Sequence, residues 1–449
     1  MIGRDALLSR LDEAIRAGGA DEVELSFSGR ERGTSRLANN ALTQCMEVSE
    51  RILRARVALG SRLGTAQTDD ISSDAVRECI RRAAAIAAVA PEHPDFRGFP
   101  GPAEPHTGGM ITDPAGPERR AASLSPILDR ARARNLSLAG LCSETLFEDA
   151  VANSRGVRVH AQRGAAKLEL IAADGDAAGY ASATAGDLAA IDHAGVGEAA
   201  CDKAERGRGP VSLPPGEYDV VLEPASVSEV LEWLGMTSFS ARDMEDGTSF
   251  LCGRIGERVM SEALTIVDDG PSPAGGHVPV PFDAEGVPKR RVTIIDRGVP
   301  CACVHDSLSA ARAGVASTGH APPLGEDLLG AAAAGDLFVE PGDRSMDELI
   351  GSVDRGLLVT RFHYVNGLLD PPRAMMTGLT RDGLFLIDGG KVKSGVRNLR
   401  WTQSILDAFS RIAGLSRERR AVPTWWSSLG AYVCPAMLVS RWTFTGQSR

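Results

Sequence analysis

Two proline- and glycine-rich breaks constrain how this chain can fold more than any other feature of its sequence. The first, Pro91–Pro117, contains seven prolines and is predicted to be a linker or an exposed loop, because it cannot form regular structure. The second, Gly207–Gly216, separates two halves of different character. Since 449 residues also exceed what one compact core usually holds, we predict two domains, at residues 1–212 and 213–449.

The first half is predicted to be an α/β domain in which helices pack on antiparallel strands. Asp21–Ser28 alternates Val23, Leu25 and Phe27 with polar residues, which is typical of a strand with one buried face. A second block with the same order of elements follows the linker, with a hairpin turn at Asn153–Gly156. The predicted helices are Arg4–Ala17, Ser72–Ala90, Glu118–Arg134 and Ala185–Arg206, and the further strands are Leu42–Val48, Ile52–Leu59, Leu138–Ala150 and Gly156–Ala173.

The second half is predicted to be a β-rich domain, so the fold class is α+β. Leu384–Asp388 and Lys391–Val396 flank Gly389-Gly390, a strong signal for a hairpin. The long loops between the strands are expected to line a cleft. The other predicted strands are Val292–Asp296, Val299–Val304, Leu357–Val365 and Leu438–Phe444, and the predicted helices are Ala225–Phe239, Gly253–Glu262, Asp306–Ala313 and Gln403–Ile412.

The charge balance and the cysteines exclude several classes of protein. A net charge of −10 gives no basic surplus for general binding of nucleic acid. The arginines of Arg30–Arg36 and Arg51–Arg56 alternate with glutamates and are interpreted as solvated strand and loop faces. Neither a signal peptide nor a membrane span is evident, and eight cysteines without a CxxC pair do not indicate a disulfide framework. We therefore expect a cytoplasmic protein that binds neither nucleic acid nor membrane.

The helix predicted after the apolar segment Tyr218–Leu222 is the first place to look for a reactive centre. It carries Glu229 and Glu232, which can share one face and hold a cation, but it contains no histidine. Such a pair is more often the wet side of an amphipathic helix whose other side is apolar. We expect that simpler arrangement, with Val230 and Leu234 among the apolar residues.

Two loops with defined polar content are the remaining candidates for a site. The first loop, Val267–Arg291, contains four acidic residues among prolines and glycines: Asp268, Asp269, Asp283 and Glu285. The second, Ser317–Pro323, is a turn that contains Thr318 and His320. His305 and His320 could meet in space, although isolated histidines usually have structural roles. Both loops could bind a ligand, although turns also select Asp, Gly and Ser for backbone reasons alone. Neither a GxSxG elbow nor a phosphate-binding glycine motif occurs.

The order of these short motifs resembles the TldD/TldE (PmbA) family of bacterial proteins over nearly the whole chain. The series comprises ELSFSGRERGTSRLANNALTQ in the first half, then DDG at Asp268, PFDAEGVPKRRVTIIDRGV at Pro281, STGHA at Ser317, TG at Thr377 and LFLIDGGKV at Leu384. The resemblance implies a cytosolic metallopeptidase system that trims peptides or unfolded segments. It also implies an N-terminal α/β part and a C-terminal β-rich part that enclose a chamber.

In that family a TldD-type subunit holds zinc in an HExxxH helix and pairs with a TldE-type subunit that has no metal of its own. EWLGMT, from Glu232 to Thr237, stands where the motif would be, so Glu232 and Thr237 replace the histidines and Trp233 replaces the catalytic glutamate. Cys434 is not a secure match for the family's cysteine ligand, and His320 stands where the family commonly has Asn. The resemblance therefore implies a TldE (PmbA)-type chain.

We accordingly expect a non-metallated subunit that lacks catalytic and metal-binding residues and works with a zinc-containing TldD-type partner in a heterodimer or larger assembly. The alternatives are a stand-alone peptide-binding or regulatory protein, to which the family's association with gyrase modulation belongs, and a hydrolase with an atypical metal site at Glu232, His305 or His320. Whether the chain is itself an enzyme stays open. The predicted substrate-binding residues are Glu232, Thr237, Asp283, Glu285, Thr318 and His320.

Overall fold

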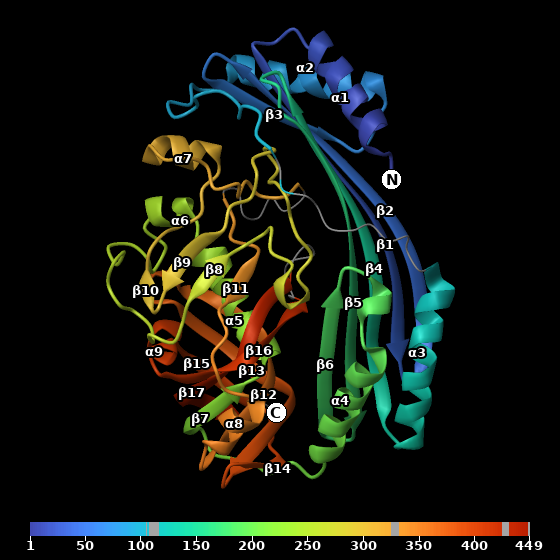
Figure 1. Ribbon diagram of the computed structural model, residues 1–449, viewed down its shortest axis with the longest axis vertical. Coiled ribbons are helices and arrows are strands. Elements are labelled where there is room, and N and C mark those ends of the chain that lie inside the picture. The colour runs from blue at the N-terminus through green and yellow to red at the C-terminus, as the bar shows by residue number, and fades with distance from the viewer. Residues whose placement is uncertain (105, 107–115, 325–331, 424–430, 448–449) are drawn as a thin grey trace.

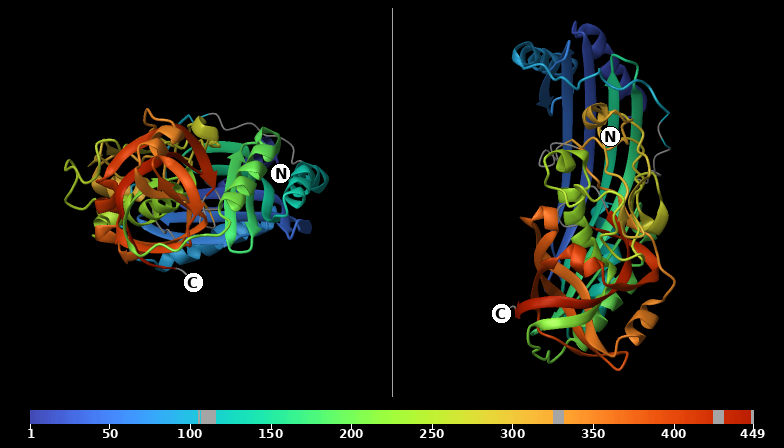
Figure 2. Two further views of the ribbon diagram at one scale, coloured as in Figure 1. Left: turned by 90° about the horizontal axis from the view of Figure 1, so that it is seen from below. Right: turned by 90° about the vertical axis from the view of Figure 1, so that its left-hand side faces the viewer.

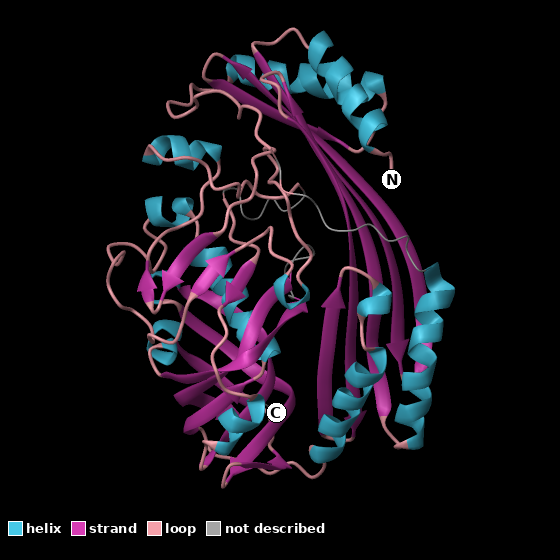
Figure 3. Ribbon diagram, in the orientation of Figure 1, coloured by secondary structure: helices cyan, strands magenta, loops and turns pink. Residues whose placement is uncertain are grey.

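Two β-sheets lie side by side in the computed structural model of this chain (Figure 1). The described residues are 1–104, 106, 116–324, 332–423 and 431–447. Helices cover the outside of the long sheet, while loops fill much of the space between the two sheets (Figure 3). The fold is α+β, as the sequence predicts. Residues 91–104 form neither a helix nor a named strand, and the rest of the predicted linker lies mostly outside the described residues.

The first sheet contains six antiparallel strands in the order β3-β2-β1-β4-β5-β6. Its four long strands run nearly the full height of the molecule (Figure 1). Tight hairpins join β1 to β2 and β2 to β3, and also β4 to β5 and β5 to β6; Asn39 and Asn40 adopt the positive φ angles that the first of these turns requires. The strands are β1 (Glu22–Ala38), β2 (Ala41–Leu59), β3 (Arg62–Thr68), β4 (Ser137–Asn153), β5 (Arg158–Asp174) and β6 (Ala177–Ala185).

One face of this sheet is apolar and is covered by helices. Side chains alternate between the faces of a strand, so Val23, Leu25 and Phe27 of β1 share one buried cluster. Gly64 on β3 allows a helix to approach closely, because a Cβ atom there would lie 2.0 Å from the carbonyl oxygen of Ala83. The covering helices are α1 (Arg4–Ala17), α2 (Ser73–Val89), α3 (Gly116–Ala133) and α4 (His193–Arg206).

The opposite face of the first sheet is polar and is turned toward the second sheet. On β1 this face consists of the even-numbered residues Glu24, Ser26, Ser28, Arg30, Arg32, Thr34 and Arg36. Its upper part meets the loop at 281–288, where the hydroxyl of Ser26 donates to the carbonyl oxygen of Ala284 at 2.7 Å. Its lower part faces a cavity. The sheet therefore has one apolar face that packs against helices and one polar face that meets the second sheet and a cavity.

Five strands of the second sheet close into a ring, because β17 pairs with both β15 and β7 while β13 and β12 complete the circuit. The ring is visible from below in Figure 2. Three aromatic residues, Phe362, Trp401 and Trp442, pack within it with ring centroids 5.0–5.3 Å apart.

The strands of the second sheet are β7 (Gly216–Leu222), β8 (Ile266–Asp268), β9 (Val292–Asp296), β10 (Val299–Pro300), β11 (Leu337–Val339), β12 (Arg355–Asp370), β13 (Met375–Asp388), β14 (Lys391–Gly395), β15 (Leu399–Ser404), β16 (Ile412–Pro423) and β17 (Ala431–Gln447). The helices are α5 (Pro224–Ser238), α6 (Ala241–Glu245), α7 (Ser307–Ala313), α8 (Met346–Gly351) and α9 (Ile405–Phe409), and short 3-10 turns lie at Leu188–Ala190, Ala274–Gly276 and Pro371–Arg373.

Several predicted elements need correction. Residues 253–262 form turns rather than a helix, since Gly253 and Gly256 adopt positive φ angles of 71° and 84°. The two strands predicted between Leu42 and Leu59 are one continuous strand. Strand β6 was not predicted, and the helix expected from Ala185 begins only at His193.

The two sheets contact each other through side chains as well as loops. Phe282 packs into an apolar cluster with Val151, Val157, Val159 and Ala161 of the first sheet. Lower down, Lys203 of α4 bonds to Glu223 at 2.6 Å. These contacts fix how the sheets face each other, whereas the boundary between residues 212 and 213 stays a prediction. Among the described residues, no helix is long and apolar enough to cross a membrane.

Candidate functional site

Helix α5 (Pro224–Ser238) is buried on nearly all sides, so the predicted wet face is wrong. Glu232 is only 1% exposed, and Trp233 and Thr237 are also buried. The helix packs against β12 and β17, which come from distant parts of the chain. Parts of the chain that are distant in sequence therefore bury a helix that its own pattern predicted to be partly exposed.

The second glutamate of α5 keeps partial contact with a cavity. Glu229 is half-buried and lines a pocket of about 210 Å³ together with Arg361 and Lys167. Burial, together with the nearby charge of Glu232, raises the pKa of Glu229 to about 8. At neutral pH this carboxyl group is therefore mostly protonated and can donate a hydrogen bond into the pocket.

Two of the residues predicted to stand at the HExxxH positions, Trp233 and Thr237, do not fit zinc. The hydroxyl of Thr237 donates to the carbonyl oxygen of Trp233 at 2.7 Å, and the Trp233 ring packs against Gly367. An indole cannot serve as a zinc ligand or as a base for water. Cys434 lies fully buried on β17, and burial raises the pKa of its thiol far above the usual value. Within the described residues, no group of three or more His, Cys, Asp and Glu side chains could hold a metal ion.

Asp283 and Glu285 lie in a buried cluster where the loop at 281–288 meets the first sheet. This cluster also contains Glu24 and Arg56, and we call the four residues the upper cluster. Arg56 bonds to Glu24 at 2.7 Å and to Glu285 at 2.8 Å. It is therefore not on the solvated face that the sequence suggested. Both oxygens of Asp283 accept backbone N–H groups, from Glu285, Val287 and Ala321. The cluster ties the loop to the sheet.

The electrostatics of the upper cluster are unbalanced, because Arg56 bonds to only two of its three carboxyl groups, Glu24 and Glu285. Burial, followed by the charge of Glu285, raises the pKa of Asp283 to about 7. Burial also raises the pKa of Glu24 to about 7, although Arg56 opposes the shift. Burial acts on Glu285 in the same direction, but Arg56 and the N–H group of Ser307 lower its pKa. Glu285 is thus the ionised member.

Thr318 and His320 belong to a second buried cluster, which we call the lower cluster and which also contains Asp268, His277, Lys289 and Asp336. His320 bonds to Asp268 at 2.8 Å through Nε2 and to Thr318 at 2.9 Å through Nδ1. The Thr318 hydroxyl also accepts the backbone N–H group of His305 at 2.7 Å, so only the backbone of His305 joins this contact. Asp336 joins the cluster by bonding to Lys289 at 2.8 Å and to His277 at 3.0 Å.

The structure thus brings four of the six predicted binding residues into two neighbouring loop clusters and places the other two, Glu232 and Thr237, on α5. All six except Thr318 are at most 8% exposed. The described contacts of Asp283, Glu285, Thr318 and His320 lie within the chain. Binding of substrate by these residues stays a prediction.

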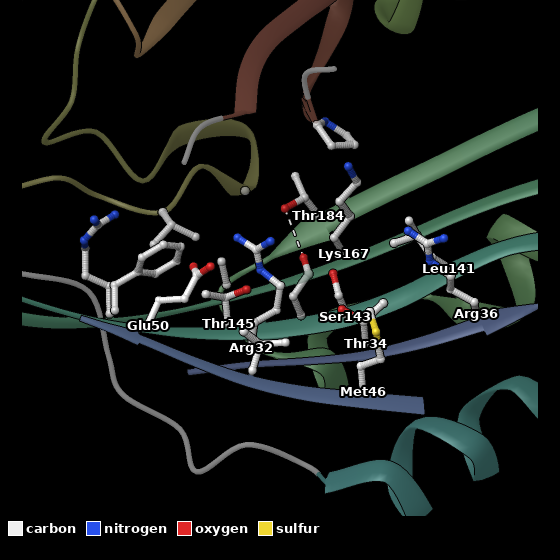
Figure 4. Close-up of a pocket in the computed structure, with 18 of the residues that line it drawn as sticks. Arg32, Thr34, Arg36, Met46, Glu50, Leu141, Ser143, Thr145, Lys167 and Thr184 are labelled. Carbon is white, nitrogen blue, oxygen red and sulfur yellow. Dashed lines mark hydrogen bonds between the residues drawn. The ribbon is translucent and has the colours of Figure 1, made fainter. Parts of the chain in front are cut away.

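The clearest open site is a cavity of about 360 Å³ between the polar face of the first sheet and the second sheet. In Figure 4 the side chains of Arg32 and Lys167 rise from the strands into this space. Gly276, His277, Val278 and Pro423 line its other side. The cavity shares Leu141, Lys167 and Pro423 with the pocket that contains Glu229, so the two adjoin.

This cavity was not predicted, although the sequence contains a pattern that indicates it. The alternation of GRERGTSR places Arg30, Arg32, Thr34 and Arg36 on one face, which was predicted to face solvent. Only the fold shows that another part of the chain stands opposite that face.

Comparison with known proteins adds independent information. Residues 215–446 match the model of the PmbA/TldA metallopeptidase C-terminal domain, and residues 23–87 match that of PmbA/TldA metallopeptidase domain 1. A metalloprotease of Methanothermobacter thermautotrophicus is 25% identical over 46% of this chain and 44% of its own length. A metalloprotease TldD homologue of Buchnera aphidicola is 28% identical over 37% of this chain and 34% of its own length. The chain thus aligns with less than half the length of these relatives.

Two solved structures share the fold over nearly the whole chain. TldE from Thermococcus kodakarensis superposes with a TM-score of 0.86 at 23% identity and covers 97% of this chain and 100% of its own. A proposed modulator of a DNA gyrase from Thermotoga maritima superposes with a TM-score of 0.84 at 20% identity and covers 97% of this chain and 99% of its own. At these identities the likeness concerns the fold alone.

Proposed function

Because the chain belongs to the PmbA/TldD metallopeptidase family, we propose that it is a TldE-type subunit that binds peptide and relies on a zinc-containing TldD-type partner for hydrolysis. In this proposal the chain itself needs no metal. It helps to form the chamber in which a short peptide or an unfolded segment is trimmed in the cytoplasm.

The observation that carries this proposal is the state of α5. The helix stands at the position expected for an HExxxH helix, but its side chains are turned to packing: Trp233 lies against Gly367 and Thr237 bonds to its own helix. Hydrolysis by a zinc enzyme needs ligands with lone pairs and a base near the bound water. Neither Trp233 nor the engaged hydroxyl of Thr237 supplies these functions.

The cavity supports the peptide-binding part of the proposal. Its floor is a β-sheet, and β6, which contributes Thr184, is the end strand of that sheet. Most of β6 is buried where it contacts β13 and β16, but its last residues, 183–185, are partly exposed and can pair with an extended peptide, largely without regard to its sequence. Such pairing suits a protein that handles varied peptides.

Purification alone and with a partner tests the proposal. The isolated chain should contain far less than one zinc per molecule by mass spectrometry and should not cleave a casein-derived peptide. Coexpressed with an HExxxH-containing chain of the same organism, it should co-elute with that chain, and peptide hydrolysis should appear. Hydrolysis by the isolated chain with one zinc bound would support the atypical hydrolase instead. Failure to co-elute with the partner would favour a stand-alone peptide-binding protein.

A further inference from the structure

The cavity on the first sheet is cationic although the chain as a whole is acidic. Among the described residues, its lining includes Arg32, Arg36, Arg163 and Lys167 but only one carboxylate, Glu50. The chain has a net charge of −10, so this balance is not an average property of its surface. A concave site with walls of one sign concentrates ligands of the opposite charge.

Two of these cations are available to a ligand. Arg163 bonds to Asp149 at 2.9 Å and Lys167 bonds to Glu169 at 2.7 Å, so their charges are partly balanced within the chain. Arg32 and Arg36 form no ion pair or side-chain hydrogen bond with any residue that the structure describes. Arg163, only 6% exposed, also has a buried Nε atom without a hydrogen-bond partner among the described residues.

The register of the sheet arranges these groups in rows. Thr34 lies opposite Ser143, Ser143 opposite Lys167, and Lys167 opposite Thr184, which makes a row of hydroxyl groups with one ammonium group. Arg32 and Arg36 stand on β1 on either side of this row. Their positions on the strand differ by four residues, which corresponds to about 14 Å between their Cα atoms.

This spacing matches an extended peptide better than a single small anion. Side chains four residues apart in an extended chain point the same way and are separated by the same distance. Guanidinium groups bind carboxylates through paired hydrogen bonds, and the hydroxyl row between them can bond to peptide groups. Met46, Val48, Leu141 and Phe147 add apolar surface for side-chain packing.

We propose that this cavity binds an extended acidic peptide, with carboxylates of residues four apart held by Arg32 and Arg36. The proposal rests on the proposed peptide-handling function, because it specifies which peptides the chamber prefers. The binding step itself needs only this chain. It can therefore be tested without the partner.

Fluorescence anisotropy with labelled six-residue peptides tests this inference. A peptide with Glu at positions 1 and 5 should bind the full chain about tenfold more tightly than its Gln counterpart, and the difference should shrink at high salt. The double variant Arg32→Gln and Arg36→Gln should abolish the preference. Arg51→Gln is the matched control, because Arg51 lies exposed on the neighbouring strand β2 and points to the opposite face.

Each other outcome counts against the proposal. Equal affinity for the Glu and Gln peptides, or an equal loss in the Arg51→Gln variant, would overturn it. A single-stranded oligonucleotide that binds at least as tightly as the Glu peptide would show a general anion surface instead. Because Arg32 and Arg36 are not part of the core, thermal unfolding should show that the double variant is folded. If the wild-type chain co-elutes with the partner but does not prefer the Glu peptide, the proposed function stands and this inference is rejected.

Discussion

The upper and lower clusters each combine acidic residues of the segment 267–291 with one from elsewhere in the chain, Glu24 or Asp336, but their charges are compensated differently. In the lower cluster Asp268 and Asp336 are surrounded by Lys289, His277 and His320. In the upper cluster Arg56 bonds to Glu24 and Glu285, and the charge of Arg54 also acts on Glu24. Both clusters are buried, so the placement of the positive charges decides which carboxyl groups can ionise.

The pKa directions follow this difference. Burial opposes ionisation of Asp336, yet Lys289 and His277 lower its pKa far below the usual value. Burial would also lower the pKa of Lys289, but Asp336 and Asp268 raise it. In the upper cluster burial prevails for Asp283 and Glu24. The lower cluster thus contains an ionised pair, Lys289 and Asp336, and the upper cluster holds protons near neutral pH.

Replacing the cation of the lower cluster should have the largest effect on stability. Lys289→Met keeps the length of the side chain but leaves Asp336 and Asp268 buried without their main positive charge. The free energy of unfolding should fall by about 3–5 kcal/mol at pH 7, as expected when one partner of a buried ion pair is removed. Urea unfolding measures this loss.

Arg291→Gln is the matched control for that experiment. Arg291 lies two residues away, is half exposed and pairs with Asp269 and Glu340 at the surface. Its replacement should cost less than about 1 kcal/mol. If both variants lost the same small amount, Lys289 and Asp336 would not form an ionised pair in the lower cluster.

The upper cluster should make the free energy of unfolding depend on pH, rather than cause one large loss of stability when a residue is replaced. The pKa of Glu24 rises from 4.5 to about 7 on folding, so the folded state binds more protons than the unfolded state between these values. Stability should therefore decrease as pH rises from 5 to 8. Glu24→Gln keeps an oxygen acceptor for Arg56 and removes this titration, so the decrease should be smaller by on the order of 1–3 kcal/mol.

Urea unfolding at several pH values measures this change in slope. Glu50→Gln, on the same face of the same sheet, is the control and should follow the wild-type profile. A profile for Glu24→Gln that runs parallel to the wild type would mean that Glu24 is ionised in the folded state throughout this range.

The sequence predicts local elements well where neighbouring residues determine them. Helix α1 has the predicted bounds because Leu7, Leu11 and Ile15 recur at helical spacing and glycines stand at both ends. The Gly389-Gly390 hairpin is also confirmed, since both glycines adopt the positive φ angles that the turn requires. These features depend on a few adjacent residues.

The candidate site depends on residues far apart, and there the sequence was less informative. The exposed side of α5 was predicted from its own pattern, but β12 and β17 bury it. Arg56 was assigned to solvent, but a loop more than two hundred residues later supplies Glu285 as its partner. Short-range patterns cannot indicate which polar face meets another part of the chain.

The smallest effect expected in this comparison concerns His320, which has a structural place in the lower cluster and is also a predicted substrate-binding residue. His320→Asn introduces the residue expected at this position from the family resemblance, but Asn is too short to reach both Asp268 and Thr318. One buried hydrogen bond should be lost, at a cost of about 1–2 kcal/mol in unfolding free energy. Peptide affinity, measured by the same anisotropy assay, should change less than twofold, because His320 is 1% exposed and its described contacts lie within the chain. Wild-type stability combined with a large loss of affinity would instead identify His320 as a group that binds substrate.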